Sequence, residues 1–243
     1  MRSRSFSNRR LSYVIVVAII AAAIATYISL SSPSGPIASV PTAVPTGVLV
    51  STPSAVPIDI AGYVAQLDAL DAASAYVDGY DRDAFGSGWK DPDRNGCDAR
   101  NDILARDLTG LTFKDGTNDC VVLSGTLSDP YTGTTIAFTR GNDTSALVQI
   151  DHVVPLSWSW SQGTAEWTDD ERVAFANDPR NLRAVDGATN SSKSDSGPSE
   201  WMPPDDAFAC VYVESFVSVL TAYDLSIGDA DRVAIRGILL GCG

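Results

Sequence analysis

Hydrophobic and polar positions divide this chain of 243 residues into three parts. An uncharged apolar run extends from Leu11 to Leu30 and follows a short stretch that contains four arginines. Residues 31–57 are rich in Ser, Pro, Thr, Val and Ala and show neither charge nor periodicity. From residue 58 onward, apolar positions recur at helix-like and strand-like spacings, which predicts one folded domain over residues 58–243.

The first part has the layout of an export signal or a membrane anchor, with its basic end in the cytoplasm. The apolar run is long enough to span a bilayer, whereas the small-x-small sequence Ala23-Ile24-Ala25 favours cleavage as a signal peptide. We expect residues 1–30 to be this signal peptide or anchor and residues 31–57 to be an extended linker. The domain would then be secreted or anchored at the outer face of the cytoplasmic membrane, touching the membrane only through an uncleaved N-terminal segment.

Within the domain, the spacing of apolar residues and the turn signals predict a mixed α+β fold with a small antiparallel sheet. Helices are expected over residues 60–70, Ala99–Leu108, 168–177, Gly187–Ser194, Asp206–Tyr223 and Asp229–Leu240. Strands are expected over Cys120–Leu127, Thr134–Thr139, Ala146–Ile150 and Asn181–Val185. The first two strands are joined by a Pro- and Gly-containing segment that is typical of a hairpin. The helix near residue 168 begins with the capping-box sequence Thr168-Asp169-Asp170-Glu171.

The charge balance limits the functions that this chain can have. Its 17 basic and 30 acidic residues give a net charge of −13, and removing the four N-terminal arginines leaves −17. A general electrostatic attraction to nucleic acid or to anionic membranes is therefore not expected. His152 is the only histidine, which excludes a zinc site that needs two or three histidines.

Four cysteines in an exported chain favour two disulfides, because oxidising compartments stabilise such bonds. Four cysteines allow three pairings. We favour Cys97–Cys120 together with Cys210–Cys242, because each of these bonds closes a local loop on one side of the His152 region.

Candidate chemistry gathers where the predicted third strand ends in Asp151-His152. A histidine has a pKa suited to a general base near neutral pH, and a carboxylate is a hard oxygen ligand for a divalent cation. Two asparagines follow: Asn181 at the start of the fourth predicted strand and Asn190 on the polar helix after it. The two strands and the helix would form a compact ββα unit.

An ordered series of motifs carries a resemblance from Tyr80 to Cys242. Its segments include Tyr80-Asp81-Arg82, Phe85–Trp89, Cys97–Asn101, Ser124–Leu127, Asp129–Gly133, Gln149–Pro155, Phe175–Asp178, Asn181-Leu182 and Trp201–Pro204. In these motifs the sequence resembles secreted HNH-type nucleases of the ββα-metal (His-Me finger) group, particularly their bacterial exported branch. The resemblance implies an α+β fold with a ββα-metal core surrounded by helices.

The resemblance also implies roles for individual residues. His152 matches the catalytic base that deprotonates the attacking water, and Asp151 matches the metal-binding carboxylate beside it. Asn181 matches the asparagine that braces the loop and orients the histidine. Asn190 stands where the third motif residue is often a metal-ligating histidine, so that the chain resembles the HNN variant.

The Asn190 variant affects the metal that we expect. Asp151 and Asn190 supply only oxygen, which favours Mg²⁺, with Mn²⁺ as the alternative, over Zn²⁺ or Ni²⁺. Lys193, one helical turn after Asn190, and Arg183 are candidate phosphate contacts.

These observations predict an extracytoplasmic, metal-dependent endonuclease that hydrolyses phosphodiester bonds of DNA, or of RNA, with little sequence specificity. The resemblance implies products with 5′-phosphate and 3′-hydroxyl ends. The alternative hypothesis is a catalytically inactive, exported binding or surface module on a nuclease scaffold, which the net charge of −17 and the Asn190 substitution favour. No Gly-x-Ser-x-Gly nucleophile elbow is present to suggest serine hydrolase chemistry.

Overall fold

A computed structural model of the chain describes residues 59–73 and 76–242, and it confirms the mixed α+β fold. Its helices are α2 (Ile60–Ala69), α3 (Ala99–Asp107), α4 (Leu156–Trp160), α5 (Asp169–Ala176), α6 (Gly187–Lys193), α7 (Ala209–Ala222) and α8 (Asp229–Leu240). Its strands are β1 (Leu108–Phe113), β2 (Val122–Ser128), β3 (Thr135–Thr139), β4 (Val148–His152) and β5 (Leu182–Asp186). Short 3-10 turns are η1 (Arg82–Phe85), η2 (Ser145–Leu147), η3 (Thr164–Glu166) and η4 (Asp206–Phe208).

The expected signal peptide or anchor and the expected linker, residues 1–30 and 31–57, lie outside the described residues. Among the residues that the structure does describe, no helix has the length and apolar character needed to cross a membrane.

The strands form two separate antiparallel sheets, with β1, β2 and β3 in one and β4 and β5 in the other. The predicted hairpin is the β2–β3 pair, in register from Ser124 opposite Thr139 to Ser128 opposite Thr135. Strand β1 was not predicted. It contains Gly110 with a φ of +62°, and its pairing with β2 is irregular at this point, so that the alternation of buried and exposed residues is lost.

The β4–β5 pair and helix α6 form the expected ββα unit. The strands pair from Val148 opposite Asp186 to His152 opposite Leu182. Helix α6 follows β5 at once, because the Asp186 side chain accepts a hydrogen bond from the Thr189 N–H and caps the helix. Glycine is required at position 187, where a Cβ atom would lie 1.9 Å from the Ala146 carbonyl oxygen. The unit is therefore compact from its first helical turn.

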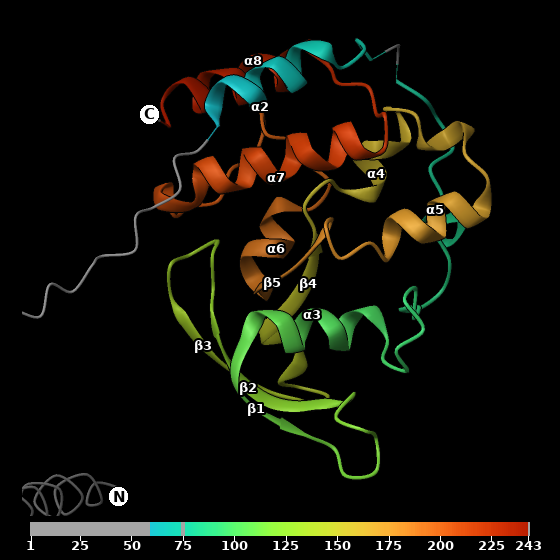
Figure 1. Cartoon of the computed structure of the whole chain (residues 1–243), viewed down its shortest axis with the longest axis vertical. Helices are drawn as coiled ribbons and strands as arrows, with labels where there is room; N and C mark the ends of the chain where they lie inside the picture. The colour runs from blue at the N-terminus through green and yellow to red at the C-terminus, as the bar shows by residue number, and fades with distance from the viewer. Residues whose placement is uncertain (1–58, 74–75, 243) are drawn as a thin grey trace, which may run out of the picture. The chain divides into compact units, whose positions relative to one another are not determined.

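Figure 1 shows β4 and β5 in the middle of the domain, between helices α2, α7 and α8 and the sheet β1–β2–β3. The helical side is a large apolar cluster in which Tyr212, Phe216 and Leu220 of α7 are fully buried. A second cluster joins α3 to both sheets through Ile103, Leu104 and other apolar residues. The ββα unit is thus held from both sides.

Several predicted details of the fold are confirmed. The disulfides are Cys97–Cys120 and Cys210–Cys242, and together they use all four cysteines. The capping box of α5 is present, with the Thr168 and Glu171 side chains each bonded to the other residue's backbone N–H.

Two helical elements differ from the prediction. The helix expected over Asp206–Tyr223 is divided into the short turn η4 and the helix α7. Helix α4 was not predicted, because five residues are too few to show a helical period.

Candidate active site

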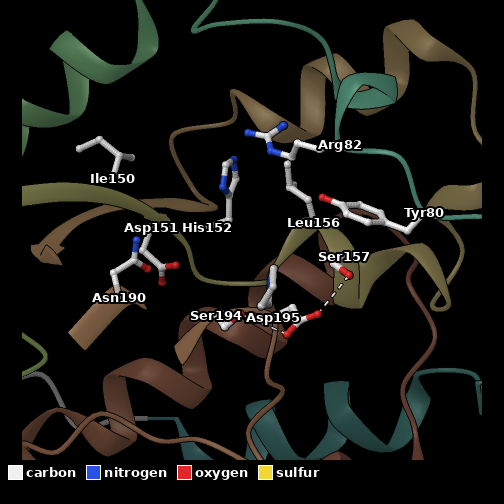
Figure 2. Close-up of a pocket in the computed structure, with 11 residues that line it drawn as sticks. Tyr80, Arg82, Ile150, Asp151, His152, Leu156, Ser157, Asn190, Ser194 and Asp195 are labelled. Atoms are coloured by element: carbon white, nitrogen blue, oxygen red, sulfur yellow. Dashed lines mark hydrogen bonds between the residues drawn. The ribbon is translucent and has the colours of Figure 1, made fainter. Parts of the chain in front are cut away.

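A cleft of about 460 Å³ lies at the end of β4 and contains three of the predicted site residues. Asp151 and His152 come from β4, and Asn190 comes from α6 (Figure 2). The opposite side of the cleft is formed by Tyr80 and Arg82, before and within η1. The fold therefore brings residues of the ββα unit together with a segment that lies about seventy residues earlier in the chain.

The His152 imidazole is held by two neighbours. Its Nε2 lies 2.8 Å from the carbonyl oxygen of Ala176, the last residue of α5. The Trp89 ring stacks on it, with ring centroids 5.9 Å apart and an angle of 14° between the planes. Because a carbonyl oxygen only accepts hydrogen bonds, Nε2 of the neutral ring must carry the proton. This tautomer leaves the lone pair on Nδ1.

The surroundings of His152 keep the imidazole neutral. Burial lowers the pKa of His152 from its usual 6.5 to about 4. The hydrogen bond to Ala176 opposes this change, and the nearby positive charges of Arg82 and Lys193 add to it. At neutral pH the ring is therefore unprotonated, and Nδ1 keeps its lone pair.

Asp151 is buried and has a partner for each carboxylate oxygen. Its Oδ1 accepts a hydrogen bond of 2.9 Å from the Lys193 ammonium, and its Oδ2 accepts one of 2.6 Å from the Tyr131 hydroxyl. Burial raises the pKa of Asp151, and the charge of Lys193 opposes this change. Burial likewise lowers the pKa of Lys193, opposed by the charge of Asp151. The two residues form an internal ion pair.

Asn190 lies beside Asp151 at the same end of the cleft (Figure 2). Its side-chain nitrogen donates a hydrogen bond of 2.8 Å to Gln149 Oε1. Within the described residues no hydrogen bond uses its Oδ1, and each Asp151 oxygen keeps a second lone pair. One carboxylate and one amide oxygen are hard donors of the kind that Mg²⁺ takes. The described residues contain no group of three or more His, Cys, Asp or Glu side chains placed to hold a metal, so water or substrate would supply the remaining ligands.

Asn181 is fully buried and braces the loop that follows β4. Its Oδ1 accepts a hydrogen bond from the Val154 N–H at 2.8 Å, and its Nδ2 donates to the Val154 carbonyl at 3.2 Å. Its own backbone carbonyl accepts from the Val153 N–H. These bonds fix the chain directly after His152 and place Asn181 away from the lining of the cleft.

The two candidate phosphate contacts have other partners. Lys193 is fully buried, and its ammonium donates to Asp151 and to the His152 carbonyl oxygen, so that it has no surface on which to meet a phosphate. The Arg183 guanidinium lies over the Phe208 ring at 5.1 Å and does not line the cleft. The expected phosphate contact of Lys193 is therefore corrected, because Lys193 serves the interior of the site. The Arg183 contact stays a prediction; its guanidinium packs over Phe208 beside α7.

Three further residues belong to the site: Trp89, Tyr131 and Arg82. No periodicity identifies them, because each comes from a loop or short turn far from residues 151–152. Their only signal in the sequence is the series of motifs, since all three stand within segments that carry the resemblance to HNH-type nucleases.

Comparison with known proteins finds the family of GmrSD restriction endonucleases, C-terminal domain, over residues 98–237. The match includes the whole ββα unit and covers more than half of the chain. A protein of Arthroderma benhamiae, described as an uncharacterized secreted protein, is 40% identical over 167 residues, which are 68% of this chain and 76% of that protein. No solved structure shows a significant match. This relative is fungal, so that the bacterial branch remains an expectation.

Proposed function

The chain belongs to the family of the C-terminal domain of GmrSD restriction endonucleases, and from this membership we propose an extracytoplasmic, metal-dependent endonuclease. Its substrate is DNA, with RNA as the alternative, and it cleaves phosphodiester bonds with little sequence specificity. The secreted relative and the two disulfides support a place outside the cytoplasm. The observation that carries the proposal is the His152 imidazole, neutral and held by its Nε2 at the edge of a cleft.

His152 acts as the general base in this proposal. Its Nδ1 accepts a proton from a water molecule as the water oxygen attacks phosphorus. A new P–O bond forms in line with the bond that breaks, and the departing 3′ oxygen takes its proton from solvent. The products carry a 5′-phosphate and a 3′-hydroxyl. Because the Ala176 carbonyl and the Trp89 ring already hold the imidazole, the base needs little reorganisation during the reaction.

Asp151 and Asn190 are the residues that would hold a divalent cation, with Mg²⁺ expected first and Mn²⁺ as the alternative. Such a cation supplies positive charge for the oxygens of the phosphoryl group and for the departing oxygen. The Lys193 ammonium and the Tyr131 hydroxyl each donate a hydrogen bond to the Asp151 carboxylate and so fix its orientation. Gln149 orients the Asn190 amide so that its oxygen remains available. Asn181 keeps the following loop in place and is a positioning residue.

The test is cleavage of a supercoiled plasmid by the purified protein with Mg²⁺, with Mn²⁺ and with a chelator. We expect cleavage with either cation and none with the chelator. His152→Ala should reduce the rate by about 10²- to 10⁴-fold, the usual contribution of a general base. Lys114→Gln, a change of an exposed residue that does not line the cleft, is the control for protein quality and should cleave like the wild type.

Two results would contradict the proposal. Undiminished cleavage by His152→Ala would remove His152 as the base. Absence of cleavage under every divalent cation, together with binding of DNA or of a protein partner, would instead support an inactive exported binding module.

A further inference from the structure

Arg82 is an exposed cation on a well-anchored turn. It begins η1, which the Asp81 side chain caps by accepting a hydrogen bond from the Asp83 N–H. Phe85 of the same turn is buried, and the carbonyl oxygen of Ala84 accepts a hydrogen bond from Arg172 of α5. Helix α5 also carries Ala176, which holds His152. The backbone of Arg82 is therefore fixed relative to the His152 ring.

The Arg82 side chain stands at the junction of two hollows. It lines the cleft of about 460 Å³ and also a neighbouring pocket of about 120 Å³. Trp89 and Ala176, the two residues that hold His152, line this second pocket. Figure 2 shows the Arg82 guanidinium directed toward the His152 ring from across the cleft.

Arg82 has no carboxylate partner among the described residues, in contrast to several other cations of the domain. Arg106, Arg172, Arg180 and Lys193 form ion pairs with Asp107, Asp169, Asp178 and Asp151. For Arg82, by contrast, the described part of the chain contains no side-chain hydrogen bond or ion pair. A guanidinium presents several N–H donors in a planar fork that matches two oxygens of a phosphate.

The charged residues in the lining of the cleft are Arg82, Asp195 and Asp151, and Asp151 is paired with Lys193. Away from Arg82, the Asp195 carboxylate accepts hydrogen bonds of 3.3 Å from the hydroxyls of Ser157 and Ser194. Since the whole chain carries a net charge of −13, a phosphate gains little from the general field of the protein. Binding of a phosphate therefore depends on a positive group that lines the cleft itself.

We propose that Arg82 binds the phosphate group that is cleaved and positions its phosphorus opposite His152. This inference rests on the proposed nuclease function and adds a substrate contact to it. The guanidinium donates to the non-bridging phosphate oxygens. Asp195 repels a phosphate placed on its own side of the cleft, so that the two residues together fix where the backbone enters.

The first test measures binding without chemistry. Each variant is combined with His152→Ala and titrated with fluorescent single-stranded and duplex oligonucleotides in the presence of a chelator. Arg82→Gln should weaken binding roughly 10- to 100-fold, the loss expected for a hydrogen-bonded charged contact. Arg82→Lys should recover part of this loss, and Asp195→Asn should tighten binding. Lys114→Gln removes the same charge from an exposed residue outside both hollows and should have little effect.

The second test uses salt. The logarithm of the binding constant falls with the logarithm of the salt concentration, and the steepness of this fall reports the number of phosphate contacts. For duplex DNA, Arg82→Gln should make the fall less steep by about one, the change expected for one lost contact. In the cleavage assay, Arg82→Gln should reduce kcat/KM by a factor similar to its loss of binding or larger.

The outcomes separate this inference from the proposed function. If the wild type cleaves but Arg82→Gln binds and cleaves equally well with an unchanged salt slope, the Arg82 contact is wrong and the nuclease proposal stands. If the wild type does not cleave, the nuclease proposal fails, and the binding titrations still decide on Arg82. Equal loss in Lys114→Gln and Arg82→Gln would show a general charge effect and would also overturn the inference.

Discussion

The hairpins β2–β3 and β4–β5 have paired segments of the same length but differ in how the strands are connected and in how far they are buried. Each pairs five residues with five in an unbroken antiparallel register. The first is joined by a short turn at residues 129–134 and exposes alternate residues such as Thr126. The second is joined by residues 153–181, and none of its strand residues is exposed. The first hairpin is specified by local sequence, whereas the second depends on partners from the whole domain.

The difference extends to charge. The ββα unit contains a buried ion pair between Asp151 and Lys193 and a histidine held neutral, and the buried Asn181 directly precedes β5. A buried ion pair is weak evidence for stability, because the cost of removing both charges from water offsets their attraction. In our account this polar interior is retained for the chemistry at the end of β4. Substitutions in the two hairpins should therefore have very different consequences.

The largest expected effect on stability comes from breaking the buried pair. Lys193→Met leaves the Asp151 carboxylate buried without its positive partner, and such a change costs roughly 3–5 kcal/mol of the free energy of unfolding. Urea denaturation of wild type and variant measures this loss. The double variant Asp151→Asn with Lys193→Met should recover much of it, because no charge is then left unpaired. A loss below about 1 kcal/mol would show that the pair does not form.

The second effect is a dependence of stability on pH that comes from His152. Its pKa is about 4 in the folded protein and about 6.5 when the chain is unfolded, so the unfolded state binds more protons between these values. The contribution of His152 to stability is therefore fully present above pH 6.5 and is lost as the pH falls toward 4, by roughly 3 kcal/mol. Unfolding measured from pH 7 to pH 4 should show this loss in the wild type. Between pH 7 and pH 4, His152→Gln should lose roughly 3 kcal/mol less of the free energy of unfolding than the wild type, because glutamine does not titrate.

The smallest effect is expected in the β2–β3 hairpin. Thr126→Ser changes an exposed residue of β2 that lines neither hollow, and such surface changes usually alter stability by less than about 0.5 kcal/mol. Denaturation and plasmid cleavage should both remain at the wild-type level. A large loss of cleavage with intact folding would mean that this sheet takes part in the site, and the contrast between the two hairpins would fail.

The same contrast explains what could be predicted from sequence. The β2–β3 hairpin, the capping box of α5 and helix α8 depend on short spacings and agree with the sequence prediction. Both disulfides agree with the prediction that each cysteine pairs within its own side of the His152 region. Strand β1 was missed because its irregular pairing at Gly110 removes the alternating pattern. Helix α4 was missed because of its length. Local signals therefore give most of the elements but not the irregular ones.

The candidate site divides in the same way. Asp151, His152 and Asn190 were placed in one ββα unit by their positions in the sequence, and they share the cleft. The burial of Lys193 could not be foreseen, because a lysine at the end of a short polar helix ordinarily faces solvent. The contacts of Trp89, Tyr131 and Arg82 arise from packing between distant segments, which periodicity does not encode.

The proposed mechanism requires a neutral His152 that carries its proton on Nε2 and leaves Nδ1 free. Because the chain has a single histidine, nitrogen NMR of the imidazole reports on this residue alone. We expect a single Nε2–H tautomer at pH 7 and a titration midpoint near 4. A midpoint near 6.5 with a mixture of the two tautomers would contradict this expectation, because the ring would then be exposed and unheld.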